Sequence, residues 1–243
     1  DVGLGPVGVA VNDNTNRIYV AGFVNGVVSV IDAASNDILE TIDVGLGPVQ
    51  IGINPTTNRI YVSNQVSDTI SVIDGLTNEV IDTVMVGGRP FEVDVNTVTN
   101  RIYVINQDSN SVSVIDGFTN KVTDTIELSS FPFGIGVNSI TNRIYAASAG
   151  NGIVSVIDGL TNEVIDTVRA GVGSVGVGVN KNTNNIYVLN FSSDTVSVID
   201  GATNKVKATL DVGDRPFPVG INLATNIIYV VNWGTDDITV VLD

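Results

Sequence analysis

Short apolar runs alternate along the chain with clusters of Gly, Asn, Asp, Thr and Pro. In one typical stretch, four apolar runs predict four β-strands, at Pro48–Asn54, Arg59–Asn64, Thr69–Asp74 and Glu79–Val86. The segments between them, such as PTTN and GLTN, contain the residues that favour turns. No segment has the apolar spacing of an amphipathic helix. The pattern therefore predicts an all-β protein.

This four-strand pattern is repeated along the whole chain. A tyrosine opens the second run of each copy at intervals of 42 residues: Tyr19, Tyr61, Tyr103, Tyr145, Tyr187 and Tyr229. A fixed period of this length indicates a repeat architecture. The six units fall at about residues 1–42, 43–84, 85–126, 127–168, 169–210 and 211–243.

The four runs of a unit, here called strands A to D, differ in character. Strands B and C are nearly continuous apolar runs (IYV, SVI), which predicts that both of their faces are buried. Strand D interleaves charge, as in KVTDTIEL, which is typical of an exposed edge. Strand A is rich in Gly, as in FGIGVN, which suits strands that converge on an axis. Such a unit describes a propeller blade, so we predict a six-bladed β-propeller that forms a single domain over residues 1–243.

The last unit is nine residues shorter than the others. The residues that it lacks are the equivalents of Ala202–Leu210, nearly the whole of strand D. We therefore expect a last blade without its outer strand. Residues upstream of Asp1 would supply that strand in a longer parent protein; the alternative is a blade that has three strands by nature.

Several segments carry a resemblance to a known family. They read YVSN (Tyr61–Asn64), YVIN (Tyr103–Asn106), YVLN (Tyr187–Asn190) and YVVN (Tyr229–Asn232), and SVIDGLTNEV (Ser71–Val80) recurs with small changes. The chain resembles the YVTN-family β-propeller repeat proteins over essentially its whole length, although units one and four read YVAG and YAAS. The resemblance implies a secreted or cell-surface protein, often a component of a surface layer.

Composition narrows the classes of function. The chain has 11 Lys and Arg against 26 Asp and Glu, a formal net charge of −15, which argues against a nucleic-acid partner. The acidic surface either keeps the protein soluble or recruits cations such as Ca²⁺. The chain has no Cys and no His, which excludes disulfides, Cys/His zinc sites and His-based general bases. No apolar run approaches the roughly 18 residues of a membrane-spanning helix, so we expect no membrane insertion.

The six units agree in two of their connections and differ in the other two. The A–B and C–D turns repeat TNR and DGxTN, which turn chemistry explains. The D–A and B–C loops should share the opposite face, and their residues change from unit to unit. These loops supply the candidate ligand-binding residues: Phe23, Gln65, Arg89, Gln107, Phe131, Phe191, Arg215 and Trp233. Chance divergence of the loops is the alternative.

Three further aromatic residues and one sequon lie near these loops. Phe91, Phe133 and Phe217 replace Val near the start of strand A, and we assign them to the core. Asn190, Phe191 and Ser192 form an N-glycosylation sequon, which the loop assignment predicts to be accessible.

Strand A of the third unit carries two carboxylates where other units have small residues. Glu92 and Asp94 are two residues apart, so they share one face of the strand. We name them as a candidate metal site for Ca²⁺, whose remaining ligands would be carbonyls and water. The alternatives are solvated acids, a salt link with Arg89, or an acid/base pair of a hydrolase.

Three functions are compatible with these features. A non-catalytic binding or adhesion module would hold a protein or glycan partner at the cell surface through the D–A and B–C loops. A structural component of the cell envelope overlaps with this reading. The alternative is a lyase or hydrolase that uses carboxylates at the mouth of the channel. We favour the non-catalytic binding module; the oligomeric state stays open.

Overall fold

The structure, a computed structural model, describes residues 2–243. These residues form 23 β-strands and no helix. The strands make six antiparallel sheets, five with four strands and the last with three. The predicted six-bladed β-propeller is confirmed, including the last blade without its outer strand. Asp1 and any residues before it lie outside the described part of the chain, so the origin of a further strand stays a prediction.

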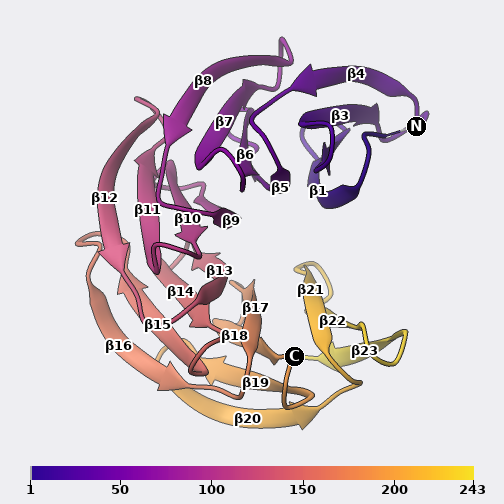
Figure 1. The fold of residues 1–243 in the computed structure, drawn as a ribbon. Coiled ribbons are helices and arrows are strands. Elements are labelled where there is room, and N and C mark those ends of the chain that lie inside the picture. The colour runs from indigo at the N-terminus through magenta and orange to yellow at the C-terminus, as the bar shows by residue number, and fades with distance from the viewer. Residues whose placement is uncertain (1) are drawn as a thin grey trace. The chain divides into compact units, whose positions relative to one another are not determined.

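Each blade takes its strands in chain order (Figure 1). The A strands are β1 (Pro6–Asn12), β5 (Pro48–Asn54), β9 (Pro90–Asn96), β13 (Pro132–Asn138), β17 (Ser174–Asn180) and β21 (Pro216–Asn222). The B strands are β2 (Arg17–Gly22), β6 (Arg59–Asn64), β10 (Arg101–Asn106), β14 (Arg143–Ser148), β18 (Asn185–Asn190) and β22 (Ile227–Asn232). The C strands are β3 (Val27–Asp32), β7 (Thr69–Asp74), β11 (Ser111–Asp116), β15 (Ile153–Asp158), β19 (Thr195–Asp200) and β23 (Asp237–Leu242). The D strands are β4 (Ile38–Asp43), β8 (Glu79–Met85), β12 (Lys121–Glu127), β16 (Val164–Arg169) and β20 (Lys205–Asp211).

The chain divides into two compact units, one ending at Thr125 and the other starting at Ile126. The first unit holds blades 1 to 3 apart from the end of β12, and the second holds blades 4 to 6. Within each unit, neighbouring A strands contact one another: β1, β5 and β9 in the first, and β13, β17 and β21 in the second (Figure 1). The expectation of a single domain stays a prediction.

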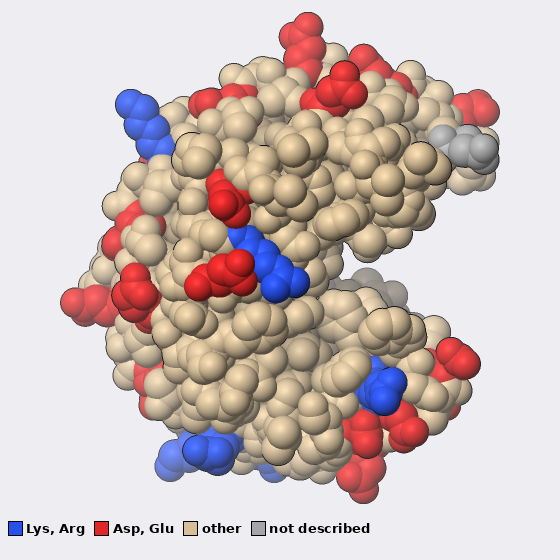
Figure 2. Space-filling model, viewed as in Figure 1, with Lys and Arg blue, Asp and Glu red and all other residues tan. Residues whose placement is uncertain are grey.

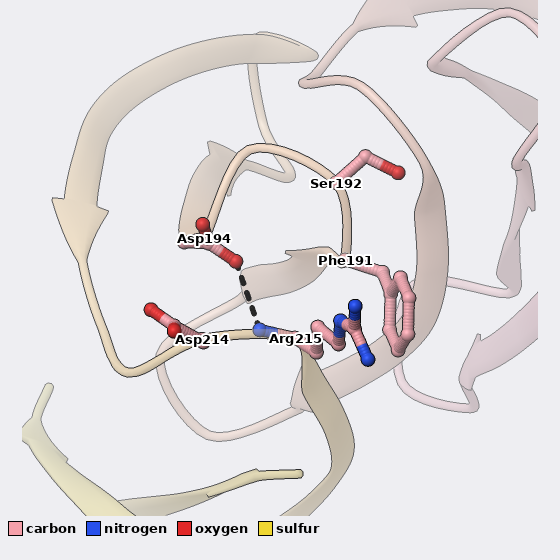
Figure 3. A pocket seen from close by; sticks show the side chains of 5 residues that line it. All are labelled: Phe191, Ser192, Asp194, Asp214 and Arg215. Atoms are coloured by element: carbon pink, nitrogen blue, oxygen red, sulfur yellow. Dashed lines mark hydrogen bonds between the residues drawn. The ribbon is translucent and has the colours of Figure 1, made fainter. Parts of the chain in front are cut away.

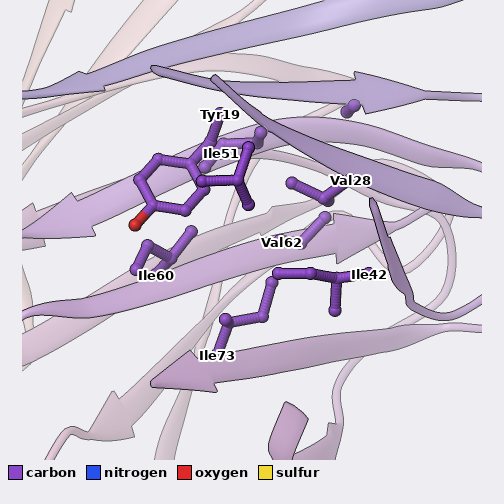
Figure 4. Packing of buried hydrophobic residues seen from close by; sticks show 9 residues of the cluster. Tyr19, Val28, Ile42, Ile51, Ile60, Val62 and Ile73 are labelled. Carbon is purple, nitrogen blue, oxygen red and sulfur yellow. The ribbon is translucent and has the colours of Figure 1, made fainter. Parts of the chain in front are cut away.

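The core lies between the faces of consecutive blades. In the first unit, Tyr19 of β2 and Val28 of β3 pack against Ile51 of β5 and Ile60 of β6 (Figure 4). Both faces of the B and C strands are buried in blades 2 and 3, as their apolar runs predict. In the last blade β23 is mostly exposed, against that expectation. The D strands are mostly exposed. In β4, only the side chain of Ile42 is buried in the core. Burying one such side chain stabilises the fold by roughly 1.5–3 kcal/mol.

Glycines in the A strands allow these strands to approach closely. A Cβ atom added at Gly8 would lie 2.2 Å from the carbonyl oxygen of Val49 on the next A strand. A Cβ added at Gly134 would lie 2.5 Å from the carbonyl oxygen of Val175. Side chains at these positions would push the blades apart, which is the physical reason why strand A is rich in glycine.

Asparagine pairs connect consecutive blades at the A–B turns. Asn54 Nδ2 donates to Asn100 Oδ1 at 2.7 Å, and Asn12 Nδ2 donates to Asn58 Oδ1 at 2.9 Å. In the second unit, Asn138 and Asn184 pair at 2.7 Å. The Asn of the TNR turn therefore has a second role beside its turn chemistry, because it also binds the preceding blade.

The C–D turns confirm the predicted turn chemistry. Asp74 Oδ1 accepts a hydrogen bond from the backbone N–H of Leu76 at 2.8 Å, and Asn78 holds a positive φ of 59°. The N–H of Gly75 donates to the carbonyl of Asn58 at 2.9 Å, which joins the C–D turn to the A–B turn of the same blade. Arg59 forms an ion pair with Asp74. These two kinds of turn share one face of each blade.

Candidate binding site

The D–A and B–C loops meet on the opposite face of each blade, as the sequence predicts. The first residue of each B–C loop donates its backbone N–H to a D–A loop carbonyl. Gln107 donates to Arg89 at 3.0 Å, and Trp233 donates to Arg215 at 3.1 Å. Two pairs of candidate residues are therefore neighbours through backbone hydrogen bonds.

The four candidates of the first unit lie in different surroundings. Phe23 and Gln65 are half-buried, on blades 1 and 2. Gln107 is buried, with 2% of its surface exposed. Arg89 is exposed, and its guanidinium lies 3.8 Å from the carboxylate of Asp108. Their role in binding stays a prediction.

In the second unit, Phe191 and Trp233 help to line one apolar cavity. We call it the aromatic hollow; it has a volume of about 220 Å³ and is lined by Phe133, Val175, Phe191, Phe217 and Trp233. The rings of Phe133 and Phe217 meet edge to face with centroids 5.8 Å apart. Those of Phe191 and Trp233 are tilted, with centroids 6.5 Å apart. Trp233 is 69% exposed, so the hollow is bordered by an exposed aromatic ring.

A polar cavity adjoins the aromatic hollow through Phe191, which lines both. This loop pocket has a volume of about 460 Å³ and is lined by Phe191, Ser192, Asp194, Asp214 and Arg215 (Figure 3). The side chain of Arg215 extends toward the ring of Phe191. The B–C loop of blade 5 supplies Phe191, Ser192 and Asp194, and the D–A loop of blade 6 supplies Asp214 and Arg215.

Three candidate residues have a strained backbone. The D–A loop residue directly before strand A has a positive φ in every blade, and in blades 1, 2 and 5 it is Gly5, Gly47 and Gly173. In the other blades it is Arg89 (φ 56°), Phe131 (φ 50°) and Arg215 (φ 54°). A bulky residue in this region costs of order 1–3 kcal/mol, and such residues are most frequent at functional sites. Of the eight candidate residues that the sequence singles out, these three carry this cost.

Aspartates of the preceding blade support two of the strained residues. The N–H of Arg89 donates to Asp68 Oδ1 at 2.8 Å, and the N–H of Arg215 donates to Asp194 Oδ1, also at 2.8 Å. Such a hydrogen bond to a charged acceptor offsets part of the strain. Asp194 therefore stabilises the backbone conformation of Arg215 within the loop pocket.

Sequence reasoning missed part of the site. The sequence predicts core positions for Phe133 and Phe217; they do pack on the core, but they also line the aromatic hollow. The signal was present, because Phe replaces Val at this position of strand A only in some blades. Ser192, Asp194 and Asp214 were not selected, since Ser and Asp in a loop are ordinary turn residues.

The prediction of an accessible sequon is wrong. Asn190 is fully buried, and its Nδ2 donates to Thr195 Oγ1 at 3.1 Å and to Ser197 Oγ at 3.0 Å. This Asn ends strand B and ties it to strand C. Asn64 and Asn106 do the same in their blades.

Glu92 and Asp94 are both half-buried on β9. Asp94 lies opposite Tyr103 of β10, and its Oδ1 accepts a hydrogen bond from the N–H of Val95 at 2.7 Å. Among residues 2–243, no group of three or more acidic side chains is placed to hold a metal ion. The Ca²⁺ site at Glu92 and Asp94 stays a prediction that carbonyls and water would have to complete.

Charged side chains do not form a single large patch on the face shown in Figure 2. They stand singly or in small groups among uncharged residues. The loop pocket is lined by two carboxylates, Asp194 and Asp214, and one cation, Arg215. The surroundings of the site are therefore acidic, like the chain as a whole.

Comparison with known proteins supports the fold. The model of the YNCE-like beta-propeller family matches residues 52–143, less than half of the chain. A chain of hydrazine synthase from Kuenenia stuttgartiensis is similar with a TM-score of 0.69 and 14% identity, over 100% of this chain and 96% of that one. A chain in the mitotic checkpoint complex is similar with a TM-score of 0.87 and 14% identity, over 97% of this chain and 74% of that one. No curated protein matches the sequence.

At such identities, the two solved structures support the β-propeller fold and nothing finer. They belong to proteins of different function, one named as a synthase and the other part of a checkpoint complex. In the described part of the chain, residues 2–243, no helix is long and apolar enough to cross a membrane.

Proposed function

We propose that this chain is a non-catalytic binding module that holds a protein or glycan partner at the aromatic hollow and the loop pocket. The observation that carries the proposal is the strained backbone of the D–A loops. Arg215 holds a φ of 54° at a position where Gly173 and Gly47 serve other blades. Glycine would relieve that strain, so the arginine side chain must contribute something that glycine does not.

The composition of the site supports binding in preference to chemistry. Tryptophan, tyrosine and arginine are the residues that dominate binding energy at protein interfaces, and the site offers Trp233 and Arg215 beside Phe191. The whole chain has no His and no Cys, the residues that most often serve as base or nucleophile. A propeller of similar fold is part of the mitotic checkpoint complex, which is consistent with a role in assembly.

The proposed location is outside the cell, either secreted or at the cell surface. It rests on the resemblance of the YVSN, YVIN, YVLN and YVVN segments to the YVTN-family repeats of surface-layer proteins. A structural role in the cell envelope is compatible with this proposal, because an envelope component also binds its neighbours.

Capture experiments test the proposal. The double variant Phe191→Ala, Trp233→Ala should fold normally and lose at least about tenfold in affinity for partners captured from cell-envelope extracts or a glycan array, since each anchor in a hot spot contributes about 2 kcal/mol. The matched control is Arg59→Ala with Arg101→Ala on the opposite face, which should capture the same partners as the wild type. If only the control loses capture, the partner binds the opposite face, and the proposal is wrong.

A further inference from the structure

The lining of the aromatic hollow distinguishes between the two classes of partner. We propose that the occupant is an extended basic segment of a partner protein, which inserts one aromatic or aliphatic side chain into the hollow. This inference rests on the proposed binding function and names the ligand chemistry at the same site. It follows from the lining, the size and the surrounding charge of the two cavities.

The lining favours an apolar group over a sugar ring. All five side chains around the hollow are apolar: Phe133, Val175, Phe191, Phe217 and Trp233. A sugar ring carries hydroxyl groups, and each hydroxyl buried without a partner costs about 1–3 kcal/mol. An apolar side chain buried at the same place gains roughly 1.5–3 kcal/mol. The hollow therefore selects against a glycan and for a side chain such as Phe or Leu.

The size of the hollow suits one side chain and no more. Its volume of about 220 Å³ lies below the roughly 300–1,000 Å³ of pockets that enclose a whole small ligand. A peptide can place one side chain there while its backbone continues across the adjoining loop pocket of about 460 Å³. Phe191 lines both cavities, so one residue would contact both parts of the ligand.

Charge around the cavities favours a basic segment. Asp194, Asp214 and Asp236 lie on the loops that carry Phe191, Arg215 and Trp233, and the whole chain has a formal net charge of −15. Asp194 is already engaged by the N–H of Arg215. Asp214 is exposed and lines the loop pocket, so it is placed to meet a Lys or Arg next to the inserted side chain.

The single tryptophan of the chain makes the inference directly measurable. Trp233 borders the hollow and is 69% exposed, so a ligand that enters the hollow should change its fluorescence. The probe is a blocked Lys-Gly-Phe-Gly-Lys peptide, which contains no tryptophan. The comparison probes are the same peptide with Ser in place of Phe, the Phe peptide with Glu in place of Lys, and a cello-oligosaccharide.

We expect a saturable fluorescence change with the Phe peptide. Affinity should be at least about tenfold lower for the Ser peptide, because the gain from burying Phe is lost. It should also fall with rising salt and for the Glu-flanked peptide. Equal affinity for the Phe and Ser peptides would overturn the inference. Saturation by the oligosaccharide alone would also overturn it, while the proposed binding function would stand.

Two variants locate the probe. Val175→Phe fills the hollow and should abolish the response to the Phe peptide. If the larger side chain prevents folding, Asp214→Asn provides the test, because it should weaken binding of the Lys-flanked peptide about threefold or more without touching the core. The control Phe118→Ala removes an exposed phenylalanine from a C–D turn and should leave the titration unchanged. Wild-type affinity in both Val175→Phe and Asp214→Asn would contradict the inference.

Discussion

The backbone N–H of Arg215 donates to Asp194 Oδ1 at 2.8 Å while Arg215 itself holds a φ of 54°. Asp194, 21 residues earlier, also has a positive φ, of 54°. Arg89 and Asp68 repeat this relationship in the first unit. In other blades glycine takes the place of the aspartate in the B–C loop, and the arginine of the D–A loop that follows is then also replaced by glycine. These pairs are Gly26 with Gly47, and Gly152 with Gly173. The two loops thus change together from blade to blade.

Replacing the strained arginine by glycine should relieve its backbone. We expect Arg215→Gly to leave the free energy of unfolding unchanged or to raise it by up to about 1 kcal/mol, since the strain that is removed exceeds the entropy lost by ordering glycine. Urea unfolding of variant and wild type measures the difference. The paired variant Asp194→Gly, which tolerates the φ of 54° at this position, should lower the free energy of unfolding by about 0.5–1.5 kcal/mol, because the N–H of Arg215 loses its acceptor. A loss above 1 kcal/mol in Arg215→Gly would show that arginine is there for stability.

The asparagine pairs should contribute strongly to stability. Asn54 is fully buried and donates to Asn100 on the next blade at 2.7 Å. Asn54→Ala removes this bond and leaves a buried group unpaired, so we expect a loss of about 1–3 kcal/mol in the free energy of unfolding. Asn222 has the same place in blade 6 but is exposed and caps its own turn. Asn222→Ala should cost clearly less, and equal losses in the two variants would argue against a role for the inter-blade bond.

Buried Tyr61 should tolerate loss of its hydroxyl group. The hydroxyl of Tyr61 is buried without a hydrogen-bond partner among the described residues, and burial raises the pKa of Tyr61 to about 12. Because the folded pKa lies above the ordinary value of 10.0, the unfolded state ionises first and stability falls between about pH 10 and 12. Tyr61→Phe should match the wild type near neutral pH and exceed it near pH 11. Thermal unfolding measures the stability of both proteins. A large loss of stability in Tyr61→Phe at neutral pH would mean that the hydroxyl has a hydrogen-bond partner.

Acid should destabilise the C–D turns. The side-chain hydrogen bond from Arg59 is the main cause that lowers the pKa of Asp74. The pKa of Asp158 is lowered first by the hydrogen bond from the backbone N–H of Leu160 and then by the side-chain hydrogen bond from Arg143. A folded pKa below the unfolded value means that this stability is present above about pH 3.9 and is lost as the pH falls through the folded pKa. Asp74→Asn with Asp158→Asn should therefore flatten the acid side of the curve of melting temperature against pH.

The control for the acid prediction is Asp43→Asn at the exposed end of β4. It should keep the shape of the wild-type curve. If Asp43→Asn flattens the acid side as much as the double variant does, the effect comes from net charge, and the turn carboxylates have no special part in it.

The sequence predicts most of the fold, because the repeat solves the same backbone problem six times with the same residues. It also predicts which loops share a face, since strand direction alone decides that. The pairing of Asn54 with Asn100 is not readable in advance, because it depends on how consecutive blades are placed against each other. The same holds for Asp194 and Arg215, whose contact links loops of different blades. The role of Phe217 is hidden in the sequence for another reason. A phenylalanine that replaces valine in a strand fits a core position, and only the structure shows that Phe217 also lines the aromatic hollow.

A bound partner should cover the aromatic hollow. Acrylamide quenching of Trp233, the only tryptophan, measures this directly when a tryptophan-free partner or peptide is bound. We expect quenching to fall on binding, because the ring is 69% exposed in the free protein. The Phe118→Ala control should give the same decrease. Unchanged quenching of Trp233 by acrylamide in the bound protein would contradict the account.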